Sequence, residues 1–392
     1  MIFQILDDKS QCKKIYCNGE IHDKLDSTAT GTWEFAKDLP KKIEYAQLYC
    51  GGKTLNDVCP EHLQGEWSQS SEKLKAYLNS FMHAKIDLNQ HCFYELVPEH
   101  FLLNFYKVKS EITNYVIQNY RKPKNYDFLL KLAAEVKKIK NKSLHLDVTE
   151  LNRHKHNLAT RNFLKKLKRT KKVIDYNIFG TKTGRLTTRP DTFPILTLKK
   201  EFRSILKPNN DLYVELDYNA AELRTLLALA EKPQPTKDIH EWNAKNVFHN
   251  QVSREEAKER IFAWLYNSES KDCLPNKVYD RSFVKEKYWD GKIVTTPFGR
   301  EIKADDFHAL NYLIQSTTSD LVLKQMINIT SLLAGRRSYV AFVVHDSLVI
   351  DLAKEDKDLI SDIVKVFGCT EFGEYKVSVQ AGKNFGELKK IL

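Results

Sequence analysis

The 392-residue chain is predicted to be an α+β protein. Residues 99–170 carry apolar side chains at spacings of three and four, the period of amphipathic helices. Strand formers dominate two other stretches, with YVELDY at 213–218 and the runs YVAFVV and LVIDLA within 339–353. Helical and strand patterns are therefore both prominent in the chain, as they are in α+β folds.

The composition favours a nucleic-acid partner. The formal net charge is +11, which favours a polyanion over an acidic small molecule. An anionic membrane surface would also attract such a chain, but no apolar run approaches the about 18 residues of a spanning helix. No targeting peptide is visible, so we expect a soluble protein in the cytoplasm, or in the host cytoplasm if the chain is viral.

The cysteines also favour a cytosolic location. There are seven, and five of them fall in the first quarter of the chain without a C-x-x-C pair. We expect reduced thiols in a cytosolic compartment. A zinc site among the five is the alternative, although their spacing does not match the common structural motifs.

Residues 1–98 are expected to form short strands and turns, with β-like runs such as FQIL, KKIYC and IEYAQLYCGGK. The helical stretch that follows ends in the basic run KKLKRTKK at 165–172. In the simplest interpretation this run is a solvated helix face. The alternative in so basic a chain is contact with a DNA backbone through Lys165, Lys166 and Lys168.

Two aspartates stand where predicted strands end. YVELDY is followed by the helical pattern NAAELRTLLALAE, which predicts strand, sharp turn and helix with Asp217 at the strand's end. Only three residues separate the two later runs, which predicts a tight hairpin with Asp346 at its tip. Taken singly, each aspartate is an ordinary turn residue. Together they suit two divalent cations roughly 3.5–4 Å apart, the arrangement that nucleotidyl transfer requires.

A helix is expected over 253–267, with Ser253 as its N-cap. At 3.6 residues per turn, one stripe is formed by residues that recur every four positions: Arg254, Lys258, Phe262 and Tyr266. Two cations suit phosphates and two aromatic rings suit a sugar and a base, so the stripe fits a nucleoside triphosphate. An amphipathic helix with core aromatics and solvated cations is the alternative.

Seven segments resemble, in the same order, motifs of family A DNA polymerases, the bacterial DNA polymerase I group. They run from 181 to 350 and read TKTGRLTTRP (followed by EFRSILKP), LDYNAAELR, DIHEWNAKNVF, SREEAKERIFAWLYN, TTPFGRE, NYLIQSTTSDLVL and VVHDSLVI. LDYNAAELR resembles motif A, SREEAKERIFAWLYN motif B and VVHDSLVI motif C. The ordered set is far more specific than any one match.

The resemblance implies roles at the catalytic centre. Asp217 and Asp346 would bind two Mg²⁺ ions, for which Mn²⁺ can substitute, and the backbone near Tyr218 would add a carbonyl. Lys258 would neutralise the triphosphate and act as general acid toward pyrophosphate. Two further residues would contact phosphates: Arg254 and His240.

Other residues would recognise the sugar, the base and the DNA. Phe262 would pack on the deoxyribose and Tyr266 would lie near the templating base. Glu222 would close the space that a 2′-hydroxyl needs, which favours DNA synthesis over RNA synthesis. Four positions would touch primer, template or the minor-groove edge of the new pair: Arg185, Asn311, Gln315 and His345.

The resemblance also implies a right-hand polymerase fold with an antiparallel-sheet palm, a helical thumb and reduced helical fingers. The expected boundaries are a small strand-rich segment at 1–98, thumb at 99–170, palm at 171–230, fingers at 231–304 and palm again at 305–392. The segment at 1–98 contains no Asp-x-Glu, so we expect no 3′ to 5′ proofreading. It would be a reduced exonuclease remnant or a platform for a separate exonuclease or processivity partner.

The chain departs from the family pattern at four positions. Ser347 replaces the Glu of the usual His-Asp-Glu of motif C, Ala263 and Asn267 stand where Gly is common, and Phe307 replaces an Arg. Ser347 and the missing glycines motivate a second hypothesis, a polymerase-derived DNA-binding protein with weakened catalysis. A single-subunit RNA polymerase is the third, and Glu222 argues against it. Lysine-rich composition indicates an AT-rich genome, such as that of a phage.

Overall fold

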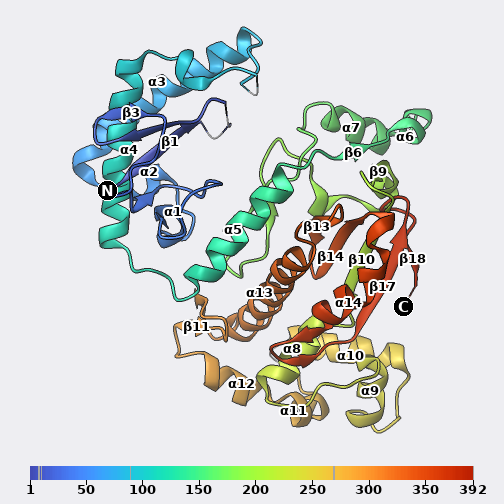
Figure 1. Ribbon diagram of the computed structural model, residues 1–392. Helices are drawn as coiled ribbons and strands as arrows, with labels where there is room; N and C mark the ends of the chain where they lie inside the picture. The colour runs from blue at the N-terminus through green and yellow to red at the C-terminus, as the bar shows by residue number, and fades with distance from the viewer. Residues whose placement is uncertain (8, 10, 89, 268–269, 392) are drawn as a thin grey trace. The chain divides into compact units, whose positions relative to one another are not determined.

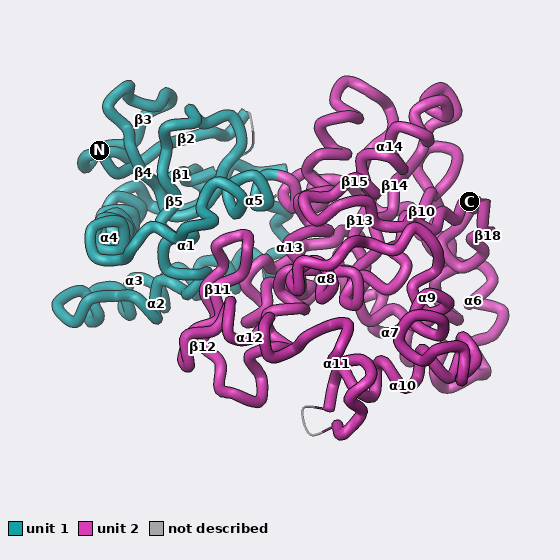
Figure 2. The backbone as a smooth tube through the Cα atoms, turned by 90° about the horizontal axis from the view of Figure 1, so that it is seen from below, with its two compact units in different colours: residues 1–134 teal, residues 135–392 magenta. Residues whose placement is uncertain are grey.

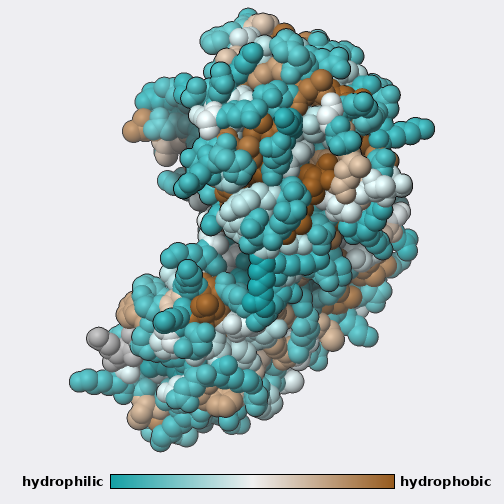
Figure 3. Space-filling model, turned by 90° about the vertical axis from the view of Figure 1, so that its left-hand side faces the viewer, coloured by the Kyte–Doolittle hydropathy of each residue, from teal (hydrophilic) through white to brown (hydrophobic). Residues whose placement is uncertain are grey.

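The computed structural model describes residues 1–7, 9, 11–88, 90–267 and 270–391. The chain divides into two compact units, Met1–Ala134 and Glu135–Leu392, which Figure 2 shows in teal and magenta. Among the described residues, no helix combines the length and the apolar character needed to cross a bilayer. The face shown in Figure 3 is mostly hydrophilic, with small hydrophobic patches.

The first unit packs small sheets, short helices and the long helix α3 around a second long helix, α4. Its elements are β1 (Phe3–Asp7), β2 (Lys14–Cys17), β3 (Glu20–His22), β4 (Gly31–Thr32), β5 (Glu44–Tyr45), α1 (Ala46–Tyr49), α2 (Leu55–Val58), the 3₁₀ helix η1 (Glu61–Leu63), α3 (Gln64–His83), η2 (Phe93–Glu95) and α4 (Glu99–Asn119). Strands β1, β2 and β3 form an antiparallel sheet, and β4 pairs with β5 in parallel. The start of α5 (Tyr126–Lys140) completes the unit.

Aromatic side chains fill the core of this unit. Trp67 packs on Phe105 with ring centroids 5.3 Å apart, and Phe105 meets Tyr106 edge to face at 5.2 Å. The expectation of strands and turns over 1–98 missed the 20-residue helix α3. It was missed because α3 buries only three residues along its length, Trp67, Ser70 and Phe81, so its apolar period is weak.

The expectation that all seven cysteines are reduced was wrong. Cys12 and Cys92 form a disulfide across 80 residues of sequence. The other five are free: Cys17, Cys50, Cys59, Cys273 and Cys369. Spacing could not predict this pair, because two residues so far apart are brought together by the fold of the whole unit.

The second unit is built on a five-stranded antiparallel sheet in the order β13-β14-β10-β17-β18, seen in Figure 1. Its strands are β6 (His145–Leu146), β7 (Tyr176–Asn177), β8 (Thr187–Thr188), β9 (Leu206–Lys207), β10 (Leu212–Tyr218), β11 (Ile293–Thr295), β12 (Glu301–Lys303), β13 (Tyr339–Val344), β14 (Ser347–Leu352), β15 (Cys369–Thr370), β16 (Gly373–Glu374), β17 (Val377–Gly382) and β18 (Lys389–Lys390). The strand over 213–218 and the hairpin over 339–353 are confirmed.

The second unit also contains helices. They are α6 (Thr149–Arg153), α7 (Leu158–Leu167), α8 (Ala221–Leu229), α9 (Ile239–Asn246), α10 (Arg254–Tyr266), α11 (Cys273–Tyr279), α12 (Arg281–Tyr288), α13 (Ala309–Leu332) and α14 (Ile360–Gly368), with 3₁₀ segments η3 (Ile195–Thr197), η4 (Lys200–Ile205) and η5 (Lys354–Leu359). The predicted cap of the motif B helix is confirmed, because Ser253 forms a capping box with Glu256 at the start of α10.

Strand β10 separates an apolar face of the sheet from a polar one. Tyr218 stacks on Phe367 of α14 with centroids 4.2 Å apart, and its hydroxyl donates to the Phe367 carbonyl at 2.6 Å. Because side chains alternate along a strand, Glu215 and Asp217 point to the opposite face. Helix α14 therefore covers the Tyr218 face of β10 and not the face that carries Glu215 and Asp217.

Candidate active site

The two predicted metal-binding aspartates lie on adjacent strands. Asp217 is the next-to-last residue of β10, and its partner in the ladder is Ser347, the first residue of β14. Asp346 precedes Ser347 in the turn of the β13–β14 hairpin. His345 allows this turn to be tight by taking a left-handed backbone with φ of 53°.

The electrostatics of this pair favour a cation. Burial, and then the nearby charges of Glu215 and Asp346, raise the pKa of Asp217 to about 7. The pKa of Asp346 is also raised by burial; Arg185 and His345 oppose the rise and Glu222 adds to it. Carboxylates that cost free energy when ionised together are stabilised by a positive ion between them.

The donor set fits Mg²⁺. No three side chains of His, Cys, Asp or Glu come together as a metal cage in the part of the chain that is described. Mg²⁺ does not need such a cage, because it usually takes one or two carboxylates and completes its shell with water and substrate phosphates. Asp217 and Asp346 supply hard oxygen ligands of that kind.

Glu222 is held in place from two sides. Its side chain is buried in the first turn of α8, and one oxygen accepts a 2.6 Å hydrogen bond from Nη2 of Arg185. The other oxygen accepts from the hydroxyl of Tyr266 at the end of α10. Three residues that the sequence assigned to separate motifs thus meet at one carboxylate.

The stripe on α10 presents its aromatic rings together. Phe262 and Tyr266 stack with an interplanar angle of 9° and centroids 6.1 Å apart, and Phe262 also contacts His240 of α9 at 5.7 Å. Burial, opposed by Asp238 and assisted by Arg254 and Lys258, lowers the pKa of His240. The imidazole is therefore expected to be neutral at pH 7.

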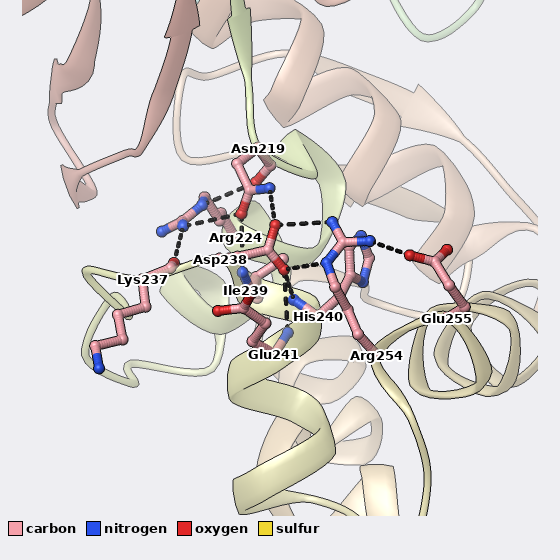
Figure 4. Close-up of polar contacts among 9 residues, drawn as sticks. All are labelled: Asn219, Arg224, Lys237, Asp238, Ile239, His240, Glu241, Arg254 and Glu255. Carbon is pink, nitrogen blue, oxygen red and sulfur yellow. Dashed lines mark hydrogen bonds and ion pairs between the residues drawn. The ribbon is translucent and has the colours of Figure 1, made fainter. Parts of the chain in front are cut away.

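Arg254 is held by a partner that the sequence did not reveal. Figure 4 shows its guanidinium forked onto Asp238, with N–O distances of 3.2 and 2.9 Å. Asn219 donates to the same carboxylate at 2.9 Å. Burial alone would raise the pKa of Asp238, but these hydrogen bonds hold it well below its usual range. Lys258, one turn along, is exposed and has no ion pair with any described residue.

Arg224, the last residue of the motif A segment, is structural. It is fully buried, and it donates to the carbonyl oxygens of Asn219, Pro235 and Lys237 at 2.9, 2.7 and 3.0 Å. These bonds tie the β10–α8 turn and the α8–α9 loop to α8, and Asp238 at the end of that loop lies beside Arg254 of α10 (Figure 4). The sequence offered one signal for this role, an arginine next to the apolar run TLLAL of its helix.

Three further motifs meet at a buried ion pair. Arg300 of the TTPFGRE segment forks onto Asp320 of α13, with distances of 2.9 and 2.7 Å. Gly184 lies against this guanidinium, because a Cβ built on it would come within 2.4 Å of Cζ of Arg300. Ser319 donates to the Gly184 carbonyl at 3.3 Å. The pair therefore supports the loop that carries Arg185.

The remaining predicted DNA-binding residues lie in different parts of the second unit. Asn311 and Tyr266 border a cavity of about 680 Å³, while Gln315 lies one turn further along α13. Lys165 and Lys166 border a groove of about 620 Å³ together with Arg169 and Arg189. Lys168 borders a different hollow of about 440 Å³. The basic run thus contributes to two surfaces rather than to one.

Comparison with known proteins supports the resemblance to family A polymerases. No family model matches the chain. The chain is 25% identical over 240 residues to DNA polymerase I of Caldicellulosiruptor bescii. This match covers 47% of this chain and 28% of that protein. The chain is also 25% identical over 291 residues to the DNA polymerase of Bacillus phage SP01, covering 54% and 31%. The matched region is thus less than a third of each relative.

A solved structure shares the fold. The POL domain of Pol1 from M. smegmatis, in complex with DNA primer-template and dNTP, superposes with a TM-score of 0.59. The match covers 87% of this chain and 81% of that chain at 14% sequence identity. The chain therefore has the mixed helix and strand fold of a DNA polymerase domain.

Proposed function

We propose that the chain is a DNA-directed DNA polymerase that adds dNTPs to a primer 3′-hydroxyl with two Mg²⁺ ions. The observation that carries the proposal is the pairing of Asp217 and Asp346 at the end of two adjacent strands, where burial and like charge disfavour ionisation without a cation. The sequence relatives and the shared fold support it. Palm, thumb and fingers are part of this proposal.

Asp217 and Asp346 would hold the metal ions, with the Tyr218 carbonyl as a further ligand. When bound, the ions activate the primer hydroxyl and stabilise the charge of the leaving pyrophosphate. Lys258 would reach the triphosphate, because it is exposed on α10 between Arg254 and Phe262. Its charge, aimed at the leaving group, would contribute most as negative charge develops there.

Arg254 and His240 would play less direct parts than Lys258. The fork of Arg254 is already taken by Asp238, so a phosphate contact by Arg254 competes with that pair. His240 is buried behind Phe262, where a neutral imidazole suits the support of the ring that packs on the sugar. Asp238 would fix the angle of α10 through Arg254.

Selection of deoxyribose is assigned to Glu222. Arg185 and Tyr266 both donate to its carboxylate, so the side chain cannot move aside without losing two hydrogen bonds. A fixed bulky group excludes a 2′-hydroxyl better than a mobile one. This favours DNA synthesis over the RNA polymerase alternative.

DNA contacts are assigned to both sides of the site. Arg185, Asn311, Gln315 and His345 would meet the primer, the template or the new base pair. Lys165 and Lys166, with Arg169 and Arg189, would follow a phosphate backbone through the groove that they share. The chain is proposed to lack proofreading and to act inside the cell, with a separate exonuclease or processivity factor at residues 1–98.

The test is primer extension with purified protein, Mg²⁺ and either dNTPs or rNTPs. Asp217→Ala and Asp346→Ala are each expected to reduce extension about a thousandfold, because the two-metal site acts as a unit. Glu222→Ala should admit rNTPs more readily. Near-full extension by either aspartate variant would remove the proposed active site, and shortening of a mismatched primer without dNTPs would reveal an unrecognised exonuclease.

A further inference from the structure

Glu215 lies beside the proposed metal site on the same face of the sheet. It precedes Asp217 by two residues on β10, so the two side chains point the same way with Cα atoms about 6.5–7 Å apart. Residues paired across an antiparallel ladder share a face, so Ser347, opposite Asp217, belongs to it too. Glu215, Asp217 and Ser347 therefore form one polar corner.

Ser347 contacts Glu215 directly. Its hydroxyl oxygen lies 3.1 Å from Oε1 of Glu215 and 3.0 Å from the carbonyl oxygen of Val344. Ser347 is buried, whereas Glu215 is half-buried. The serine thus anchors a carboxylate of the neighbouring strand next to the position where motif C has a carboxylate of its own in the resembling polymerases.

Glu215 has no positive partner in the protein. No Lys, Arg or His forms an ion pair with it among the described residues. A half-buried carboxylate without a cation costs free energy, and here a second carboxylate lies two residues away. A purely structural role would be served as well by glutamine, which accepts the same hydrogen bond from Ser347 without the charge.

We propose that Glu215 is an outer carboxylate of the metal site, supplied by β10 and held by Ser347. Its part is to add negative charge beside Asp217 and so to strengthen divalent-ion binding through a metal-bound water. The charge missing from the hairpin is thereby restored from the adjacent strand. This inference rests on the proposed function of Asp217 and Asp346.

The experiment measures metal binding without catalysis. Mn²⁺ alone is titrated into the full chain, and free Mn²⁺ is followed by electron paramagnetic resonance. Glu215→Gln is expected to weaken binding about tenfold, within the range for groups that support metal ligands. Glu374→Gln, at an exposed carboxylate on β16, is the matched control and should bind like the wild type.

A second variant distinguishes charge from structure. Ser347→Glu combined with Glu215→Gln returns one carboxylate to the corner from the other strand, and most of the lost affinity should return. Unchanged Mn²⁺ binding by Glu215→Gln would overturn the proposal. The proposal would also be overturned if the double variant had the melting temperature of the wild type in EDTA but recovered no affinity for Mn²⁺.

The outcome for the proposed function is read separately. Asp217→Asn and Asp346→Asn should each lose most Mn²⁺ binding whatever Glu215 does. If they do and Glu215→Gln does not, only the role of Glu215 fails. If neither aspartate variant changes binding, the metal site itself is misplaced and both proposals fall.

Discussion

The two units bury different kinds of side chain. In Met1–Ala134 the core is aromatic and aliphatic, and Asp7 is the one charged side chain that is almost fully buried among the described residues. Glu135–Leu392 buries many more: Glu135, Glu222, Arg224, Asp320, Asp351 and Asp356. Burying a charge is costly unless it is paired. The contrast indicates that the second unit holds polar groups in fixed positions at a cost in folding free energy, an arrangement that active sites require.

The largest expected effect comes from removing one half of a buried pair. Asp320→Ala leaves the guanidinium of Arg300 without its partner in a site where Asp320 is fully buried. The free energy of unfolding should fall by about 3–5 kcal/mol, measured by denaturant unfolding. Asp358→Ala, at an exposed aspartate of the same unit, is the control.

Replacing both partners sharpens this prediction. Arg300→Met with Asp320→Leu should recover most of the lost stability, because an apolar pair avoids the desolvation cost. Extension should nevertheless stay reduced, since the loop of Gly184 and Arg185 loses its support. Full activity in this stable double variant would show that the pair serves folding alone.

The first unit should respond instead to loss of its disulfide. Cys12→Ser opens a link across 80 residues and should cost about 2–4 kcal/mol of stability. The midpoint of unfolding should shift, while primer extension by the folded protein should not. Cys273→Ser, at an exposed free thiol, should change neither. Equal loss of extension and stability would mean that the two units do not behave separately.

The sequence predicted the structure of the second unit better than that of the first, for a physical reason. Its motif residues are polar groups at fixed spacings on regular elements, so YVELDY and the capped helix after Ser253 could be placed by periodicity alone. The partners of those residues could not be placed. Asp238 and Arg254 lie 16 positions apart, and they are brought together by the packing of α9 on α10 and by the buried bonds of Arg224.

The first unit lacked such signals. Helix α3 is largely exposed and polar, so little of its pattern reported a buried face. The pairing of Cys12 with Cys92 depends on the fold between them. At the candidate site, alternation along β10 places Glu215 on the face of Asp217, but the contact of Glu215 with Ser347 depends on the register between β10 and β14.

A smaller effect is expected on the salt dependence of DNA binding, when exposed lysines of either unit are replaced. Changing Lys165, Lys166, Lys168 and Lys171 to Gln should flatten the salt dependence of DNA binding, with a slope smaller by up to about 0.9 for each phosphate that is no longer neutralised. Binding is followed by fluorescence anisotropy at several salt concentrations. The matched control changes four exposed lysines of the first unit: Lys37, Lys41, Lys73 and Lys75. A larger effect of the control would assign DNA binding to the first unit.

A pH dependence of stability is also expected from the buried carboxylates of the second unit. Its described carboxylates with a raised pKa are Asp217, Asp320 and Asp346, whereas in the first unit the resolved shifts of carboxylates are downward. The pKa of Asp217 rises from 3.8 to about 7 on folding, so the folded protein holds a proton that the unfolded chain releases. Stability from this proton is present below pH about 4 and is lost as the pH rises to about 7.

The comparison that isolates this effect is wild type against Asp217→Asn in EDTA. Over pH 4 to 7 the melting temperature of the wild type should fall relative to that of the variant, because only the wild type must ionise a buried carboxyl beside Glu215 and Asp346. Added Mg²⁺ should oppose the fall in the wild type by pairing with the ionised group. The melting temperatures of the two proteins could instead differ by a constant amount from pH 4 to 7 without metal. The carboxylates would then not be close enough to repel one another. The electrostatic contrast between the units would fail at the proposed metal site, where the proposed function depends on it.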